Sequence, residues 1–333
     1  MRDLSISVFF ARAVLKNAVK QGLDVVELLR KNRISPRLLQ EQSARISIER
    51  FADLQVSTII AMQDEALGYA SQRMPVGTWS MMCHAVIGSE TLGQALHRYC
   101  RFFQLFEFGL RPHLVIDEDY VHIRVQPFDD ADVYQTYSGE SILFNTHRFA
   151  SWLVQEFLPI HAIDLGCAAQ AEPDDYRRMF LSHPVNFEQE NTQLTLSSTL
   201  LGKRITQNEQ ALSRFLRHPV LILLTENYAR SSWTAQVRNR VRHNLENMPE
   251  LNEVAAHLEV HPQTLRRRLS AEGTHFKEIK NQLRRDTALH FLGKQGLSIE
   301  EIAHRAGFSE PSAFIRAFKG WTGITPYTYR KGL

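Results

Sequence analysis

The stretch IAHRAGFSEPSAFIRAFKGWTGITP, residues 302–326, decides the fold of the C-terminal part of the chain. A short helical pattern ends at Gly307, and a second one follows in which Phe314 and Phe318 lie four residues apart. Large apolar residues at this spacing lie on one face of a helix, and glycine adopts the left-handed backbone that a tight turn requires. The stretch therefore predicts two helices joined by a turn.

An earlier stretch, VAAHLEVHPQTLRRRLS at residues 254–270, repeats this pattern. Each copy has a branched aliphatic residue followed by alanine, a tight turn, and a helix with two large apolar residues four apart. Ala255 and Ala303 are small enough to let the two helices of each copy approach closely. Pro262 suits the first position of its helix, and Ser309 is the expected N-cap in the second copy. The duplication is typical of a double helix-turn-helix domain.

The second helix of each copy is the expected recognition helix. Its large apolar residues must face inward to hold it against the first helix, so its remaining side chains face solvent. Polar and basic side chains of these kinds hydrogen-bond base edges or phosphates in the major groove of DNA. The expected DNA contacts are Gln263, Thr264, Arg266 and Arg267 in the first copy, and Ser312, Ala313, Arg316 and Lys319 in the second.

Basic residues are concentrated at this end of the chain. Residues 231–333 contain 16 Lys and Arg against 10 Asp and Glu, whereas the preceding residues contain 23 against 26. A net charge of +6 suits a polyanionic partner, so we interpret Arg266 to Arg268 as a DNA-facing cluster rather than an ordinary solvated run of charge. Arg267 and Arg316 occupy equivalent positions in the two copies, which leaves open a structural or phosphate-directed role for either.

Residues 276–292 are expected to form one helix between the two copies, because apolar residues recur along them at helical spacing. At about 1.5 Å per residue this linker helix would span roughly 25 Å. Successive major grooves on one face of B-DNA are about 34 Å apart, so a moderately bent duplex could receive both recognition helices. One chain would then read two adjacent half-sites.

The part of the chain before this domain mixes helical and strand patterns. Residues 113–126 alternate apolar and polar side chains on either side of Asp117-Glu118-Asp119, which predicts a β-hairpin. Further strands are expected at residues 162–167 and 192–196, and helices near residues 10–18, 25–29, 49–62, 91–103, 132–157, 174–180 and 208–228, with another starting at Ser35.

A short polar break at residues 229–232 coincides with the change in charge and marks the expected domain boundary. We therefore predict an α+β domain over residues 1–230. Residues 231–333 are expected to form an all-α domain with two helix-turn-helix motifs joined by a linker helix.

This C-terminal region resembles the DNA-binding domain of AraC/XylS-family transcription regulators over about 100 residues. The matching segments are residues 254–256, 262–267, 272–276 and 302–326, together with Arg284 and Ala288 of the linker. Ala313 departs from the family pattern, because this position often carries a polar side chain there, and this weakens a base contact at that position. The resemblance implies a regulator that binds promoter DNA, and we expect neither an enzymatic role nor a cofactor.

The N-terminal part resembles, more distantly, the non-cupin ligand-binding domain of one branch of that family. The matching segments are residues 89–96, 176–180 and 183–187. The resemblance implies that residues 1–230 form an effector-binding and dimerisation domain. Aromatic side chains near a basic group suit an apolar pocket for an acidic ligand, although the same residues could simply be core. The candidate effector contacts are Arg98, Tyr99, Phe102, Phe103 and Phe106.

The sequence disfavours several other functional classes. Cys83, Cys100 and Cys167 are widely spaced and lack a C-x-x-C pattern, so they predict neither disulfides nor the zinc-type cysteine cluster that a fused alkylation-repair module would need. The histidines show no metal-ligand spacing. No apolar run approaches the roughly 20 residues that span a bilayer, and the N-terminus lacks a secretory signal. We expect no catalysis, no metal, no membrane association and a cytoplasmic location.

Together these patterns predict a sequence-specific transcription regulator, expected to activate in response to a small-molecule effector. Its expected partners are double-stranded promoter DNA, RNA polymerase and a second copy bound through the N-terminal domain. The alternative is a DNA-bending or nucleoid-associated protein without an effector. The dissimilar outward faces of the two recognition helices favour the first hypothesis, because they suit a particular asymmetric site.

Overall fold

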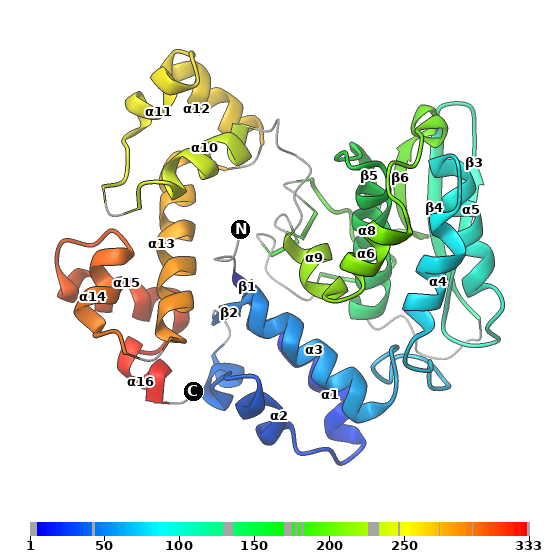
Figure 1. Ribbon diagram of the computed structural model, residues 1–333, viewed down its shortest axis with the longest axis horizontal. Coiled ribbons are helices and arrows are strands. Elements are labelled where there is room, and N and C mark those ends of the chain that lie inside the picture. The colour runs from blue at the N-terminus through cyan, green and yellow to red at the C-terminus, as the bar shows by residue number, and fades with distance from the viewer. Residues whose placement is uncertain are drawn as a thin grey trace. The chain divides into compact units, whose positions relative to one another are not determined.

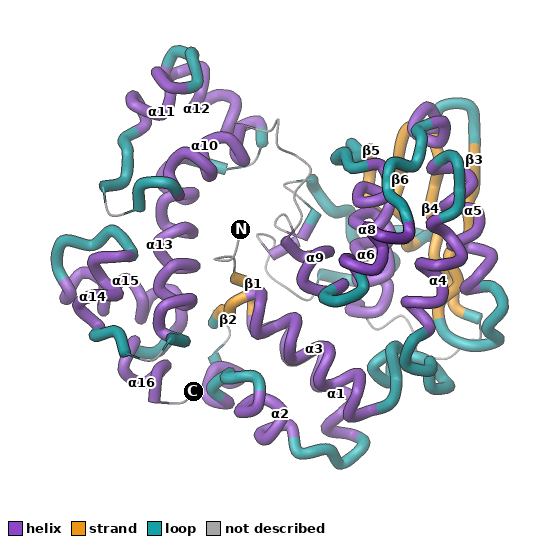
Figure 2. The backbone as a smooth tube through the Cα atoms, in the orientation of Figure 1, coloured by secondary structure: helices purple, strands orange, loops and turns teal. Residues whose placement is uncertain are grey.

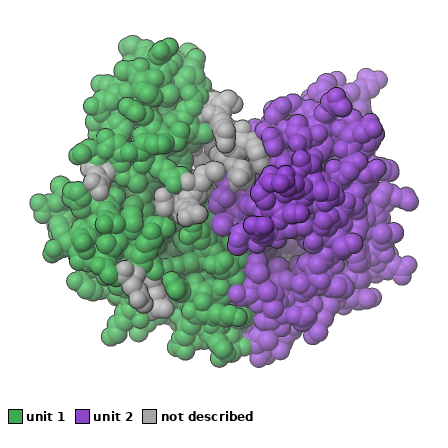
Figure 3. Space-filling view, viewed as in Figure 1, with its two compact units in different colours: residues 1–12, 24–54, 229–333 green, residues 13–23, 55–228 purple. Residues whose placement is uncertain are grey.

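The computed structural model of the chain divides into two compact units. One comprises residues 1–12, 24–54 and 229–333, and the other comprises residues 13–23 and 55–228 (Figure 3). The structure describes residues 5–41, 44–128, 136–169, 175–176, 179–180, 183–225, 233–245, 247–272, 274–294 and 296–331. The predicted boundary at residues 229–232 lies outside the described residues.

An antiparallel four-stranded sheet, of strand order β3-β4-β6-β5, forms the framework of the second unit (Figure 1). The predicted hairpin is confirmed as β3 and β4. In its turn the Asp117 carboxylate accepts hydrogen bonds from the backbone N–H groups of Asp119 and Tyr120, at 3.1 and 2.8 Å. The strands are β3 Leu110–Ile116, β4 Tyr120–Pro127, β5 Ile160–Asp164 and β6 Thr192–Ser197.

Helices complete this unit. They are α4 Thr78–Ile87, α5 Leu92–Phe103, α6 Thr136–Val154, the 3-10 helix η2 Ser198–Gly202, α8 Glu209–Phe215 and α9 Pro219–Thr225. The prediction missed α4, and the single helix predicted over residues 208–228 is wrong, because the chain breaks before Pro219, which has no N–H to continue the helix. Residues 174, 177 and 178 of the helix predicted at 174–180, and residues 132–135 of that predicted at 132–157, lie outside the described part of the chain.

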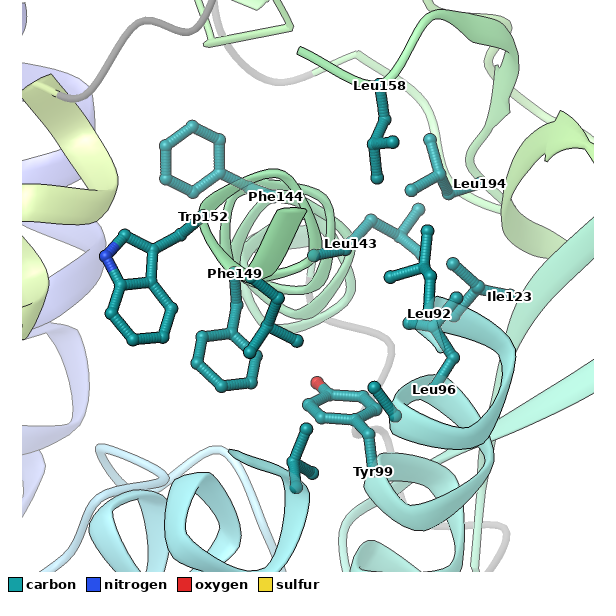
Figure 4. Packing of buried hydrophobic residues seen from close by; sticks show 14 of the residues in the cluster. Leu92, Leu96, Tyr99, Ile123, Leu143, Phe144, Phe149, Trp152, Leu158 and Leu194 are labelled. Atoms are coloured by element: carbon teal, nitrogen blue, oxygen red, sulfur yellow. The ribbon is translucent and has the colours of Figure 1, made fainter. Parts of the chain in front are cut away.

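The core of this unit lies between α5, α6 and the sheet. Val121, Ile123 and Val125 alternate inward from β4 and are at most 1% exposed. Figure 4 shows that Leu143 of α6 points toward Ile123, while Tyr99 rises from α5 beneath the same helix. An antiparallel sheet buried on one face therefore accounts for the alternation seen in the sequence.

The first unit contains an N-terminal segment and the C-terminal helices. Arg50, on α3, donates hydrogen bonds to the Arg33 carbonyl at 2.8 Å and to the Tyr329 hydroxyl at 3.4 Å. Helices α1 Val8–Lys20 and α3 Ile48–Met62 are divided between the units, and the segment also contains β1 Ser5–Ser7 paired with β2 Arg45–Ser47, α2 Val25–Lys31, and the 3-10 helix η1 Pro36–Gln40. The helix predicted to start at Ser35 is this 3-10 turn.

The C-terminal helices form two groups joined by α13, which contacts α10 on one side and α14, α15 and α16 on the other (Figures 1 and 2). The linker helix has the predicted bounds. The helices are α10 Trp233–Arg242, α11 Leu251–His257, α12 Pro262–Ala271, α13 Phe276–Leu292, α14 Ile299–Arg305, α15 Pro311–Thr322 and α16 Pro326–Lys331. The predicted fold class, α+β followed by an all-α region, is confirmed. Along the described ranges, every helix is too short or too polar to cross a membrane.

Candidate DNA-binding surface

Local sequence signals define the first helix-turn-helix, α11 and α12. Glu250 and Glu253 form a capping box at the start of α11. The turn places Glu259 at φ 54°, and the His261 side chain then accepts a hydrogen bond from the Gln263 backbone at 3.2 Å. Pro262 occupies the first position of α12, as predicted. The free backbone N–H groups at the start of α11 are therefore satisfied by a capping box. At the start of α12 one N–H is satisfied by His261, and Pro262 has none.

The second helix-turn-helix, α14 and α15, depends on Gly307. Its φ is +77°, and a Cβ atom built there would lie 2.5 Å from the Leu245 carbonyl oxygen. Only glycine fits such a position without strain. The predicted cap at Ser309 is wrong, since the N-cap of α15 is Glu310, which makes no side-chain cap bond. Pro311 follows as the first helical residue. Proline has no backbone N–H, so α15 has one fewer N–H group for a cap to satisfy.

The inward faces of both recognition helices agree with the sequence pattern. Leu265, Leu269, Phe314 and Phe318 are at most 1% exposed, and so are the alanines of the first helices, Ala255 and Ala303. Burying four large side chains in this way stabilises the motifs by about 1.5–3 kcal/mol per side chain. Each recognition helix is consequently held in one rotation about its axis.

The outward faces carry the predicted DNA contacts. On α12, Gln263, Arg266 and Arg267 are exposed and Thr264 is half-buried, and on α15, Ser312, Arg316 and Lys319 are exposed and Ala313 is half-buried. The Arg266 guanidinium donates to the Gln263 side-chain oxygen at 3.2 Å. Within the described residues, Arg267, Arg316 and Lys319 form no ion pair. Their charges are therefore presented to solvent.

The run of three arginines does not act as one cluster. The guanidinium of Arg268 lies 4.0 Å from the ring centroid of Trp233, at the start of α10. This cation–π contact directs Arg268 toward the protein. Arg266 and Arg267 remain on the exposed face, so the interpretation of a three-residue DNA-facing cluster is corrected to two residues.

Glu272 holds α10 against the end of α12, a role that sequence reasoning missed. Its carboxylate accepts hydrogen bonds from the backbone N–H groups of Trp233 at 2.8 Å and Thr234 at 2.7 Å, and from the Thr234 hydroxyl. A carboxylate at a helix N-terminus satisfies free N–H groups and compensates the helix dipole. The Glu272-Gly273 pair belonged to the matched segments, but nothing in the sequence indicated its partner.

Charged residues of the linker helix α13 pair with residues of the neighbouring helices. Asp286 is 3% exposed and accepts from the Arg238 guanidinium of α10 at 2.9 Å, while the same guanidinium donates to Gln282 at 2.8 Å. Lys280 pairs with Glu250 at 2.8 Å. The linker is thereby bound to both helices α10 and α11.

Arg284 connects the linker to the second motif. Its guanidinium donates to the Gly307 carbonyl at 3.0 Å and lies 4.9 Å from the ring centroid of Phe308. Burial lowers the pKa of this guanidinium, and the nearby Glu250 partly opposes that shift. Arg284, which matched the family pattern in the sequence, thus joins the linker helix to the turn of the second motif by a hydrogen bond.

The candidate effector contacts are brought together only in part. Tyr99 is 2% exposed, its hydroxyl lies 2.8 Å from that of Thr146, and burial raises its pKa. Rings run in contact from Tyr99 through Phe103, Phe102 and Phe106 to Phe108. Arg98 is exposed, and its guanidinium lies near Gly88. Tyr99 is a core residue (Figure 4).

Two of the three cysteines lie in the interior of the second unit. Cys83 and Cys100 are buried, and burial raises the pKa of both thiols, that of Cys100 to about 12. A thiol in such surroundings stays protonated and unreactive. Over the described ranges, no three His, Cys, Asp or Glu side chains are grouped as metal ligands would be.

Comparisons with known proteins agree with this geometry. A family model described as the arabinose-binding domain of AraC transcription regulator, N-terminal, matches residues 22–205, and a helix-turn-helix domain model matches residues 254–332. The ornithine utilization regulator of Pseudomonas aeruginosa is 26% identical over 329 residues, which are 98% of this chain and 96% of that protein.

Two further similarities extend over most of the chain. An uncharacterized HTH-type transcriptional regulator of Mycobacterium tuberculosis is 23% identical over 333 residues, or 97% of this chain and 96% of its own length. The crystal structure of the transcriptional regulator CdpR from Pseudomonas aeruginosa is 23% identical, with a TM-score of 0.29, and covers 78% of this chain and 88% of CdpR.

Proposed function

Because this chain belongs to the AraC family of DNA-binding transcription regulators, we propose that it activates transcription at promoters whose sequence its two recognition helices read in adjacent major grooves. The observation that carries the proposal is the outward face of each recognition helix. Hydrogen-bonding and basic side chains cover both faces, while the large apolar residues of both are buried.

We assign the two faces different contributions. On α12, Arg266 is held beside Gln263, and a guanidinium with an amide neighbour suits bidentate contacts to base edges. On α15, Lys319 is a single exposed ammonium in the last turn, which suits a phosphate. The first motif would then supply most base recognition, and the second would supply more of the electrostatic affinity.

Residues 1–230 are proposed as the regulatory domain, which binds an effector and joins two copies, and residues 231–333 as the DNA-binding domain. Family membership supports this organisation but does not define the effector, because the matching model is described by arabinose and one full-length relative is named for ornithine utilization. An effector would act by binding more tightly to one arrangement of the two DNA-binding domains in the dimer than to another. RNA polymerase is the proposed downstream partner, and the cytoplasm, where promoter DNA lies, the site of action.

Selection of bound sequences from a random duplex pool tests this function. With the full chain at a stated salt concentration, we expect a motif of two unequal boxes about one helical turn, or roughly 10.5 base pairs, apart. Equal affinity for the selected site and for random duplex would overturn sequence-specific regulation and favour a DNA-bending protein without an effector. The matched control is a double variant, Arg266→Ala with Arg316→Ala, which should enrich no motif.

Dimerisation is tested separately. We expect the mass of a dimer in light scattering at micromolar concentration, and a monomer mass would contradict the proposed role of the regulatory domain. Reporter transcription from the selected site, measured with and without the protein, distinguishes activation from repression.

A further inference from the structure

Glu140, on helix α6, is a buried carboxyl that the described part of the chain leaves half satisfied. It is 0% exposed, and its Oε1 accepts a hydrogen bond from the Tyr176 hydroxyl at 2.7 Å. Its Oε2 is also buried and has no hydrogen-bond partner. No Lys, Arg or His among the described residues forms an ion pair with it.

Three tyrosine side chains, those of Tyr69, Tyr137 and Tyr176, lie near this carboxyl. The rings of Tyr69 and Tyr137 lie 5.6 Å apart, and the ring of Tyr176 lies 4.9 Å from that of Phe187. Burial raises the pKa values of Tyr69 and Tyr137, and the nearby Glu140 raises both further. The two phenol groups are therefore close enough to Glu140 to be influenced by its charge.

The helix that carries Glu140 also carries a buried cation, but that cation is engaged elsewhere. The guanidinium of Arg148 lies 5.2 Å from the ring centroid of Phe144 and donates to the Met179 carbonyl at 3.5 Å. A buried carboxylate without a counter-ion is costly, and proteins avoid that cost by pairing it or by protonating it. Burial raises the pKa of Glu140 to about 7, despite the opposing hydrogen bond from Tyr176.

We propose that Glu140, with Tyr69, Tyr137 and Tyr176, forms the polar end of the effector site, and that the effector carries an ammonium or guanidinium group. A cation hydrogen-bonded to Oε2 would make a charge-assisted pair with the unsatisfied oxygen. Aromatic faces add attraction for a cation and none for an anion. The inference rests on the proposed effector-binding role of residues 1–230 and names the chemical class of that effector.

Binding on this scheme exchanges one cation for another. Below about pH 7 a proton neutralises the Glu140 carboxyl in the free chain, and the ammonium group of the ligand replaces that proton. One proton leaves for each protonated carboxyl that binds a ligand, and no covalent bond other than the O–H bond is broken. The affinity for an amine should therefore fall as the pH decreases below about 7, approaching tenfold per pH unit.

Calorimetry and thermal unfolding of the full chain with four-carbon probes test the proposal. We expect n-butylamine and putrescine to bind and raise the Tm, whereas n-butanol and butyrate, of the same chain length, should not. Glu140→Gln should lower the amine affinity at least tenfold, and Glu107→Gln, at an exposed position, should leave it unchanged. Failure of both amines to bind, or equal binding by the Glu140→Gln variant, would overturn the proposal.

Two further measurements keep the result interpretable. The number of protons released on amine binding is measured by repeating the calorimetry in buffers of different ionisation enthalpy. Absence of proton release at pH 6 would contradict the replacement of the Glu140 proton by the ammonium group. If Glu140→Gln fails to fold, Tyr176→Phe, which removes the hydroxyl that donates to Oε1, should weaken amine binding more modestly. A chain that selects a DNA motif but binds neither amine overturns this inference alone, whereas amine binding without a DNA motif overturns the proposed regulator and leaves the cation site standing.

Discussion

The carbonyl of Gly307 accepts a hydrogen bond from the guanidinium of Arg284 at 3.0 Å, which joins the turn of the second helix-turn-helix to the linker helix. The same glycine lies against the Leu245 carbonyl, close to where α10 ends. Three segments of the DNA-binding region therefore meet at one residue without a side chain. The orientation of the second motif relative to the first depends on this junction.

Gly307→Ala should lower the free energy of unfolding by about 1–3 kcal/mol, because the added Cβ meets a backbone oxygen at a positive φ. The matched control is Gly320→Ala in α15, where a Cβ meets nothing within 4 Å. That substitution should stabilise the chain by about 0.5–1 kcal/mol, as alanine does within helices. Urea denaturation measures both, and equal effects of the two substitutions would contradict the strained junction.

Arg266→Ala should cost about 1–3 kcal/mol of DNA-binding free energy and relax the sequence preference at one position, if Arg266 contacts a base. Lys319→Ala should instead weaken binding to all sequences alike and reduce the salt dependence of binding. Fluorescence anisotropy with the selected site and single-base variants, at several salt concentrations, separates the two effects. An Arg266→Ala variant with unchanged affinity and preference would show that α12 is not the recognition helix.

Glu272→Gln should destabilise the first helix-turn-helix group by about 1–2 kcal/mol, because an amide lacks the charge and the second acceptor that cap α10. Glu259→Gln, which removes the same charge from an exposed turn position, is the matched control and should change stability little. Amide hydrogen exchange at the start of α10 gives a local readout. Unchanged protection of those amides in the Glu272→Gln variant would argue against the capping role.

Lowering the pH should reduce the free energy of unfolding of the second unit, because His147 is buried there. Burial lowers the pKa of this imidazole to about 4, while its hydrogen bond with the Leu158 carbonyl acts in the opposite direction. The folded state thus disfavours protonation, so the stabilising effect is complete above the usual pKa of about 6.5 and is lost as the pH falls toward 4.

His147→Gln removes this titration and should flatten the acid limb of a plot of unfolding free energy against pH. The difference between the native and variant curves should amount to at most about 3 kcal/mol across that range. Parallel curves between pH 4 and 7 would mean that His147 does not titrate differently in the folded and unfolded chains.

The sequence by itself determined the two helix-turn-helix motifs, the linker helix and the β3-β4 hairpin. Each of these elements is encoded locally, since apolar periodicity, a proline at a helix start and a glycine at a turn all act within a few residues. The same local signals placed Leu265, Leu269, Phe314 and Phe318 on the buried faces, and their burial in the structure agrees.

Only the tertiary structure decided which polar groups are engaged within the protein. Arg268 has the same side chain as Arg266 and Arg267, yet its guanidinium packs on the ring of Trp233, a partner that the sequence did not indicate. The partners of Glu272 lie 38 and 39 residues away along the chain, and Glu140 meets Tyr176 across 36 residues. Charge and hydrogen-bonding partners are chosen by proximity in space, and no periodicity within a single helix records that proximity.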